Sequence, residues 1–149
     1  MASPKIAALV LAGLLCAGVA HAEMPMATLY TWHCSGCHGA AGHGVPLAGI
    51  PDLAYSGAYL LVPQGRAYLI QVPGVSQSKL DDATAAAMLN WALARFSAAN
   101  LPANFKPYST AEIRRLRANV ASDAETQRKV IVASLRKLGK LPVDYVPAR

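Results

Sequence analysis

The chain has 149 residues, of which 54% are hydrophobic and 15% are charged, and its formal net charge is +6 at pH 7. This length suits about one domain, and three cysteines are too few for a scaffold held together by several disulfides. The basic residues are not interleaved with aromatic ones, so the positive charge does not indicate a nucleic-acid-binding protein.

Residues 1–22 have the pattern of an export signal. Lys5 supplies a short positive start, and residues 6–19 form an apolar run of the length found in signal peptides, too short to span a bilayer. The alanines at positions 20 and 22 fit a signal-peptidase site. We therefore expect cleavage after Ala22 and a periplasmic mature protein.

Two further observations concern a membrane anchor. Cys16 could mark a lipoprotein signal, but Leu15 before it is bulky where such a signal has a small residue. No run after residue 22 is long and apolar enough to span a bilayer. The sequence therefore predicts no transmembrane anchor in the mature chain.

The first predicted helix covers residues 27–34 and leads into a C-x-x-C-H motif formed by Cys34, Cys37 and His38. This spacing is the one used for covalent attachment of a c-type haem. The two thiols lie about one turn of chain apart and could form thioether bonds to both vinyl groups of one porphyrin. His38 would then lie beside the ring, where its imidazole could bind the iron as the proximal ligand.

Two other interpretations of the cysteines are weaker. A redox dithiol with this spacing normally opens a helix that follows a strand, and no strand pattern precedes Cys34. A zinc site would need two more ligands, and the remaining cysteine lies in the expected signal. One covalent haem c is therefore the best account of Cys34 and Cys37.

Glycine and proline divide the next part of the chain. Glycines between residues 39 and 44 would let the backbone pass close to a porphyrin edge. We predict a loop over residues 45–53, a short helix or an irregular segment over residues 53–61, and a short helix over residues 65–71. Val72-Pro73-Gly74 is expected to end that helix, because proline and glycine disfavour its continuation.

The strongest helix signal in this part covers residues 81–96. Asp81 or Asp82 can cap its N-terminus, and both carboxylates favour that positive end. The helix would present two neighbouring apolar stripes to the first helix and the haem. These stripes consist of Leu89, Leu93 and Phe96 and of Met88, Trp91 and Ala92.

Residues 101–108, which contain two prolines, are predicted to be a linker. Two capping-box patterns then open helices over residues 109–119 and 122–138, and Gly139 ends the second. One face of that second helix would point inward, and the other would meet water. The inward residues would be Val130, Ala133, Leu135 and Leu138, and the outward ones Arg128, Lys129, Arg136 and Lys137.

Charge is unevenly distributed along the chain. Residues 23–100 contain three Lys or Arg and four Asp or Glu, whereas residues 101–149 contain ten and four. The basic character therefore belongs to the C-terminal part and not to the part that carries the motif. A solvated helix surface is the simpler explanation, and docking to an acidic redox partner or an anionic membrane is the alternative.

The order of these features resembles the class I c-type cytochromes. It comprises a helix ending in Cys-Ser-Gly-Cys-His-Gly, a loop rich in glycine and proline, a short middle helix, a Pro-Gly turn and a helix with an aromatic residue near its end. The resemblance covers residues 26–96. It implies one-electron transfer, haem attachment through Cys34 and Cys37, proximal ligation by His38, and Trp91 as the packing aromatic of the last core helix.

The resemblance also implies the fold. We expect an all-α protein, a small cytochrome c-like helical fold around one covalent haem with two extra C-terminal helices. The predicted parts are a signal peptide over residues 1–22, a haem domain over residues 23–100, and a basic helical extension over residues 101–149 packed on or beside it.

The sequence departs from the family at the sixth iron ligand. The family usually has methionine before the Pro-Gly turn, whereas this chain has Val72, which has no lone pair for iron. Met88 and His43 are weak substitutes, because core packing explains a methionine within a helix and His43 lies in the loop on the proximal side. The remaining donors, which no spacing selects, are Met24, Met26, His33, Lys79 and Tyr68.

Three functions follow from these features. The favoured one is an exported electron carrier, not an enzyme, that exchanges electrons with a periplasmic redox protein or dehydrogenase. The second is a haem protein with an open sixth position that binds a small ligand or has weak peroxidase-like activity. No distal His/Arg pair supports the second function, although Arg66 and Gln71 are polar residues of that region. The third is a non-catalytic subunit that binds a larger complex through the C-terminal helices.

Overall fold

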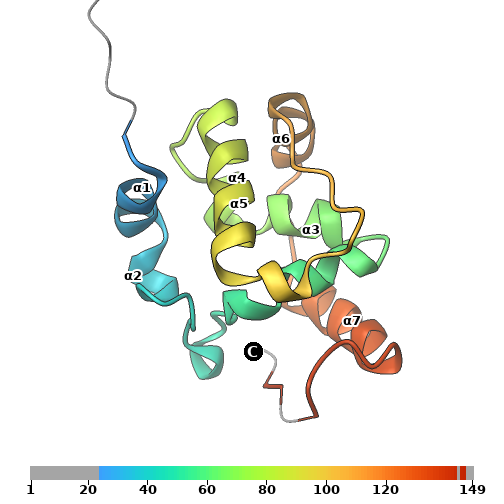
Figure 1. The fold of residues 1–149 in the computed structure, drawn as a ribbon. Coiled ribbons are helices and arrows are strands. Elements are labelled where there is room, and N and C mark those ends of the chain that lie inside the picture. The colour runs from blue at the N-terminus through green and yellow to red at the C-terminus, as the bar shows by residue number, and fades with distance from the viewer. Residues whose placement is uncertain (1–23, 144, 147–149) are drawn as a thin grey trace, which may run out of the picture.

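The structure is a computed structural model that describes residues 24–143, 145 and 146 (Figure 1). The predicted export signal, with Cys16 and the cleavage site after Ala22, lies outside these residues. Every regular element in the described part is helical, and Val45 and Ile50 form an isolated β-bridge. The predicted all-α class is confirmed.

Seven α-helices and three 3-10 helices follow one another along the described residues. The α-helices are α1 (Met26–His33), α2 (Ser35–His38), α3 (Gly65–Gln71), α4 (Pro73–Ser76), α5 (Asp82–Phe96), α6 (Thr110–Arg117) and α7 (Ala124–Lys137). The 3-10 helices are η1 (Pro46–Ala48), η2 (Leu53–Leu61) and η3 (Ala98–Asn100). None of these helices has the length and apolarity needed to cross a lipid bilayer.

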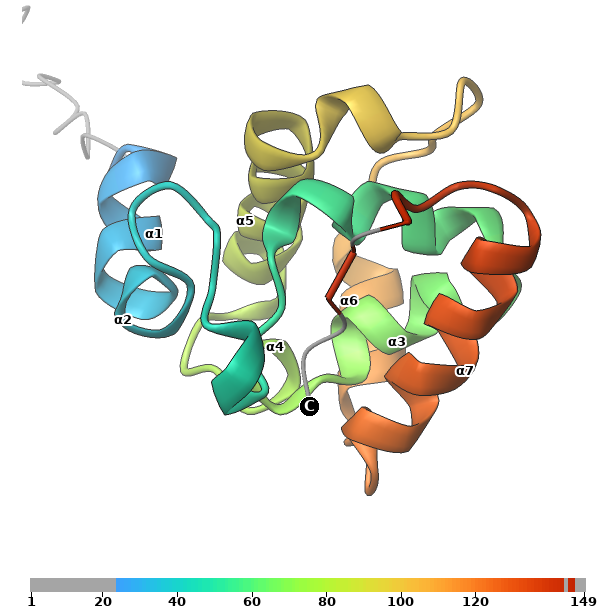
Figure 2. The ribbon, with the colours of Figure 1, turned by 90° about the horizontal axis from the view of Figure 1, so that it is seen from below.

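The helix α5 lies at the centre of this arrangement. The helix α1 packs against one side of α5 and α6 packs against the other, while α7 contacts α3 and η2 (Figures 1 and 2). The long middle helix therefore connects the N-terminal helices, which carry the C-x-x-C-H motif, to the C-terminal helices.

Residues from both parts of the chain share one hydrophobic core. Ile70 of α3 and Leu93 of α5 are at most 1% exposed, and so are Ile113, Ile131 and Leu135 of the C-terminal helices. Full burial of an aliphatic side chain stabilises a fold by about 1.5–3 kcal/mol. The C-terminal helices thus stabilise the part that carries the motif, and the domain division at residue 100 stays a prediction.

The inward face of α7 differs from the predicted one. Its buried residues are Arg128, Ile131, Val132 and Leu135, which follow helical spacing on one face. Val130, Ala133 and Leu138 are exposed, so their predicted inward position was wrong. The error came from treating Arg128 as solvated. Its guanidinium donates a hydrogen bond to the Tyr68 hydroxyl at 3.4 Å, and its aliphatic stem can cover apolar surface.

Local capping signals explain where the longer helices begin. Asp81 caps α5 by accepting hydrogen bonds from two backbone N–H groups of its first turn, and Ser109 caps α6 in the same way through one. The cap of α7 is Asp123, not Ser122 as the capping-box pattern had predicted. A side-chain oxygen at this position replaces the hydrogen bonds that the first turn of a helix lacks.

Three short segments are helical where the sequence predicted a turn or left the structure open. The C-x-x-C-H motif itself forms α2, so Gly36 is helical. Residues 53–61 form a 3-10 helix. The Pro-Gly turn ends α3 at Gln71, as predicted, but Pro73 then begins α4, because proline fits the first position of a helix.

Candidate haem site

The C-x-x-C-H motif forms one turn of helix directly after α1. Cys34 is the N-cap of α2, and its carbonyl oxygen accepts hydrogen bonds from the N–H groups of Cys37 at 3.2 Å and His38 at 3.0 Å. The two thiols are therefore presented from a single turn. Both are free, and burial, with a smaller contribution from Cys37, raises the pKa of the Cys34 thiol.

The imidazole of His38 is oriented by a backbone contact. Its Nδ1 lies 3.1 Å from the carbonyl oxygen of Pro51. A carbonyl oxygen can only accept, so Nδ1 carries the hydrogen and the lone pair of Nε2 stays available for a metal. Burial lowers the pKa of His38, partly offset by the Pro51 hydrogen bond and the charge of Asp52, and so favours the neutral imidazole that metals bind.

A glycine allows Pro51 to reach His38. Gly44 has φ +63°, and its N–H donates a hydrogen bond to the carbonyl oxygen of His38 at 2.9 Å. A Cβ on Gly44 would collide with the carbonyl oxygens of Ile50 and Pro51. The sequence suggested that glycines here make room for a porphyrin, whereas Gly44 is needed for the close approach of the chain to itself.

Comparison with known proteins identifies relatives of this chain. No family model matches the chain. A cytochrome c-552 of Thermus thermophilus is 32% identical over 148 aligned residues, which cover 87% of this chain and 95% of that protein. A second cytochrome c-552 of Thermus thermophilus is 31% identical over 125 aligned residues, covering 71% and 91% of the two chains.

The chain belongs to the c-type cytochromes. It is accordingly an electron carrier rather than an enzyme, and membership implies covalently bound haem c. The resemblance that the C-x-x-C-H motif and the order of the helices indicated is confirmed.

The donors of the motif fit such a haem. Cys34 and Cys37 lie on one helical turn without a disulfide, and His38 keeps one ring nitrogen available. Within residues 24–143, 145 and 146, no group of three or more His, Cys, Asp or Glu side chains could hold a metal ion. The zinc interpretation therefore finds no ligand set in this part of the cytochrome.

An aromatic cluster fixes α1, and with it the motif, against α5. The Tyr30 ring lies 5.6 Å from the Trp91 ring and 4.9 Å from the Phe96 ring, centroid to centroid. The Tyr30 hydroxyl donates a hydrogen bond to the carbonyl oxygen of Gly39 at 2.7 Å, directly after the motif. No sequence signal pointed to this hydrogen bond or to the role of Pro51.

The candidates for the sixth iron ligand lie in different surroundings. Met88 is 5% exposed within α5, whereas the His43 side chain is 77% exposed and its Nδ1 lies 3.5 Å from the Asp52 carboxylate. Val72 follows α3 and packs against the hydrophobic core. Met88 is thus buried on α5 and His43 lies at the surface, and the identity of the sixth ligand stays a prediction.

The remaining polar candidates are either exposed or in contact with other side chains. His33 and Lys79 are exposed, and the Tyr68 hydroxyl is contacted by Arg128. The guanidinium of Arg66 is bound to Glu112 of α6. Arg66 therefore serves the packing of α3 on α6 in this structure.

Proposed function

We propose that one haem is attached through Cys34 and Cys37, with His38 as its proximal ligand, and that the mature protein carries single electrons in the periplasm. The contact that supports this most directly is the hydrogen bond between Nδ1 of His38 and the carbonyl oxygen of Pro51. An iron ligand benefits from a fixed tautomer, because only the deprotonated ring nitrogen binds metal. Removal of the signal after Ala22 belongs to the same proposal.

The surroundings of the motif suit electron transfer. Thioether bonds to Cys34 and Cys37 would keep the haem in place through many redox cycles. The packing of Tyr30 against Trp91 and Phe96 holds the motif rigidly on α5, which limits reorganisation when the charge of the iron changes. Cys37 is exposed, so the motif lies at the surface, where electrons can enter and leave.

The proposed partner is a periplasmic redox protein or dehydrogenase that docks beside the motif. Trp32, two residues before Cys34, is 65% exposed, and tryptophan is enriched at protein interfaces. The basic C-terminal helices are weaker candidates for docking, because several of their cations are already paired within the chain. Arg114 and Arg117, for example, both bind Asp82.

Production of the full chain in a host with cytochrome c maturation tests the attachment. The exported protein is expected to begin at residue 23, to be coloured, and to carry the mass of one haem that denaturation does not release. The C34A/C37A variant should lose the covalent haem. A colourless wild-type protein with both thiols reactive would refute the proposal.

Val72 supports a second candidate function, a haem whose sixth position is open to a small ligand or to weak peroxidase-like chemistry. Absorption and EPR spectra, with and without carbon monoxide, distinguish the two. High-spin ferric iron and ready binding of carbon monoxide by the reduced protein would favour the open site. A low-spin spectrum with a methionine-to-iron charge-transfer band would reject it, and Met88→Ala would then show whether Met88 is that ligand.

A further inference from the structure

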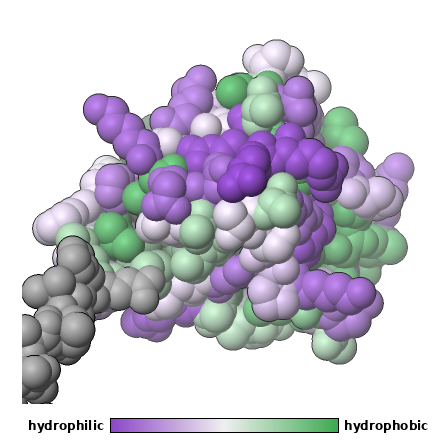
Figure 3. Space-filling model, turned by 90° about the horizontal axis from the view of Figure 1, so that it is seen from above, coloured by the Kyte–Doolittle hydropathy of each residue, from purple (hydrophilic) through white to green (hydrophobic). Residues whose placement is uncertain are grey.

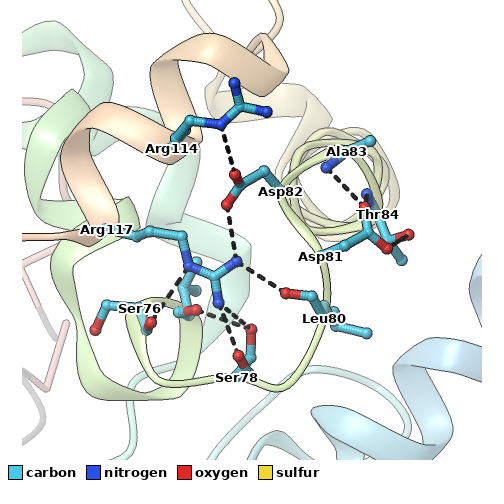
Figure 4. A network of polar contacts seen from close by, with 10 residues as sticks. Ser76, Ser78, Leu80, Asp81, Asp82, Ala83, Thr84, Arg114 and Arg117 are labelled. Carbon is cyan, nitrogen blue, oxygen red and sulfur yellow. Dashed lines mark hydrogen bonds and ion pairs between the residues drawn. The ribbon is translucent and has the colours of Figure 1, made fainter.

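Arg117 of α6 binds the loop that joins α4 to α5. Its guanidinium donates hydrogen bonds to the carbonyl oxygens of Ser78 at 2.7 Å, Leu80 at 2.8 Å and Ser76 at 3.4 Å (Figure 4). The Arg117 side chain is only 15% exposed, although arginine is usually a solvated residue. The C-terminal part of the chain therefore holds a loop that precedes it by 37 to 41 residues.

Asp82, the first residue of α5, holds the guanidinium in place. Its Oδ1 accepts from Nη1 of Arg117 at 3.2 Å, and its Oδ2 accepts from Nε of Arg114 at 3.0 Å (Figure 4). The hydrogen bond from Arg114 and then that from Arg117 lower the pKa of the Asp82 carboxyl. Asp82, at the end of the loop, therefore binds two arginines. Only one of them, Arg117, also contacts the carbonyl oxygens of the loop.

Charged and polar groups surround this loop. Seen from the end of the molecule where α6 and the N-terminus of α5 lie, hydrophilic side chains gather in a band across the surface (Figure 3). The exposed charged residues of the loop and these two elements include Lys79, Asp81, Arg114 and Arg115. Hydrogen bonds to Arg117 therefore restrain the loop backbone between its ends, beside the packing of the partly buried Leu80 against the core.

The loop faces the helices that carry the motif. In two perpendicular views, the chain between α4 and α5 lies on the side of α5 that is turned toward α1 and α2 (Figures 1 and 2). A porphyrin attached to α2 and ligated by His38 would turn its other face away from His38, toward segments across from α2. The loop held by Arg117, on the side of α5 turned toward α1 and α2, would be one of these segments.

We infer that Arg117 is a positioning residue of the haem site, which fixes the α4–α5 loop of residues 77–81 and so limits the access of small ligands to the haem face opposite His38. The inference rests on the haem attachment proposed above. It gives the C-terminal helices a role at the site, because the restraint on the loop comes from α6. Lysine cannot replace the arginine, since one ammonium cannot span three carbonyl oxygens and a carboxylate as a planar guanidinium does.

Arg117→Lys and Arg114→Lys in the full-length, haem-loaded protein form a matched pair. Both keep a cation beside Asp82, but only R117K loses the contacts to the loop carbonyls. The measurements are the hydrogen exchange of the Gln77 and Ser78 amides, which donate to the carbonyl oxygens of Pro73 and Val75, and the rate of carbon monoxide binding to the reduced protein. Because hydrogen bonds from charged donors stabilise a closed state by roughly tenfold or more, both rates should rise about tenfold in R117K. In R114K both should stay within about twofold of the wild type.

Each other outcome overturns a stated part of the inference. Unchanged loop exchange in R117K would mean that Arg117 does not hold the loop. Faster exchange without faster carbon monoxide binding would mean that the loop does not limit access to the haem. The same would follow if neither the wild type nor R117K bound carbon monoxide. Equal changes in R117K and R114K would assign the effect to the shared contact with Asp82. Failure of haem attachment would instead appear as a colourless protein, in which the loop exchange is still measurable.

Discussion

The carboxylate of Glu112 accepts two hydrogen bonds from the guanidinium of Arg66, at 2.6 Å from Nε and 2.7 Å from Nη2. The same guanidinium lies 4.1 Å from the centroid of the Tyr108 ring and donates to the carbonyl oxygen of Lys106 at 2.8 Å. One side chain of α3 therefore binds α6 and the segment that leads into it. Contacts of this kind join the C-terminal helices to the part of the cytochrome that carries the motif.

Glu112→Gln is expected to remove a pH-dependent part of the stability. The hydrogen bonds from Arg66 hold the pKa of the Glu112 carboxyl below its ordinary value. A lowered carboxyl pKa stabilises the fold above the ordinary pKa, and this contribution is lost as the pH falls through the lowered value. Urea unfolding of the haem-loaded protein from about pH 7 down to pH 3 should therefore show a steeper loss for the wild type than for E112Q.

Glu125→Gln is the matched control for this experiment. Glu125 pairs with Lys129 within α7, and the two side chains are 49% and 61% exposed. Exposed pairs of this type contribute at most about 0.5 kcal/mol, so E125Q should follow the wild-type curve. If E112Q and E125Q both follow that curve, the Arg66 contact does not set the pH dependence.

Substitutions of Leu135, within α7, and of Leu138, its C-terminal cap, test which face of the helix is buried. Leu135 is fully buried and Leu138 is 55% exposed. Leu135→Ala should lower the free energy of unfolding by about 2–5 kcal/mol, because it leaves a cavity in the core. Leu138→Ala should change it by no more than about 0.5 kcal/mol. Urea unfolding measures both, and a larger loss for L138A would contradict the observed orientation of α7.

Signals that act over a few residues allowed much of the fold to be predicted. The helix over residues 65–71 has the predicted bounds, since a Pro-Gly turn follows it, and α5 begins after Asp81, one of its two predicted caps. The face of α7 could not be predicted, because Arg128 is buried and has among its partners the hydroxyl of Tyr68, 60 residues earlier. A charge can be placed inside a protein only when its distant partner is known.

The candidate site likewise has features that local sequence predicts and features that depend on contacts between distant residues. The grouping of Cys34, Cys37 and His38 within about one turn of chain was predicted because their spacing is local, and the structure forms this turn as a helix. The orientation of His38 depends on the carbonyl oxygen of Pro51, which a loop brings back, and a backbone oxygen has no signature in a sequence. The binding of the α4–α5 loop by Arg117 was missed for the same reason, since three of its acceptors are carbonyl oxygens.

Tyr30→Phe is expected to weaken the attachment of the motif to α1. The change keeps the ring contacts with Trp91 and Phe96 but leaves the carbonyl oxygen of Gly39 without the hydroxyl at 2.7 Å. The loss of one such hydrogen bond should cost about 1 kcal/mol in urea unfolding of the haem-loaded protein. Tyr30→Leu should cost at least about 1 kcal/mol more, because it also removes two aromatic contacts. Equal stability of Y30F and the wild type would show that the hydroxyl contributes nothing.

Alanine substitutions of Gly44 and Gly139 distinguish the cost of backbone strain from the cost of moving Pro51. Both glycines have φ +63°, but a Cβ would collide with the carbonyl oxygens of Ile50 and Pro51 at Gly44 and would meet nothing within 4 Å at Gly139. Gly139→Ala should therefore cost only the strain of a left-handed residue, about 1 kcal/mol. Gly44→Ala should cost about 3 kcal/mol or more, because the backbone of residues 50 and 51 has to move.

Movement of Pro51 would also be visible at the haem. Because Pro51 accepts the hydrogen bond from His38, its displacement should lower the basicity of the imidazole and shift the absorption spectrum and the reduction potential. These shifts are expected in G44A and not in G139A, with urea unfolding, absorption spectroscopy and redox titration as the measurements. Equal stability losses in the two variants, or an unchanged potential in G44A, would mean that the contact between Pro51 and His38 does not depend on Gly44.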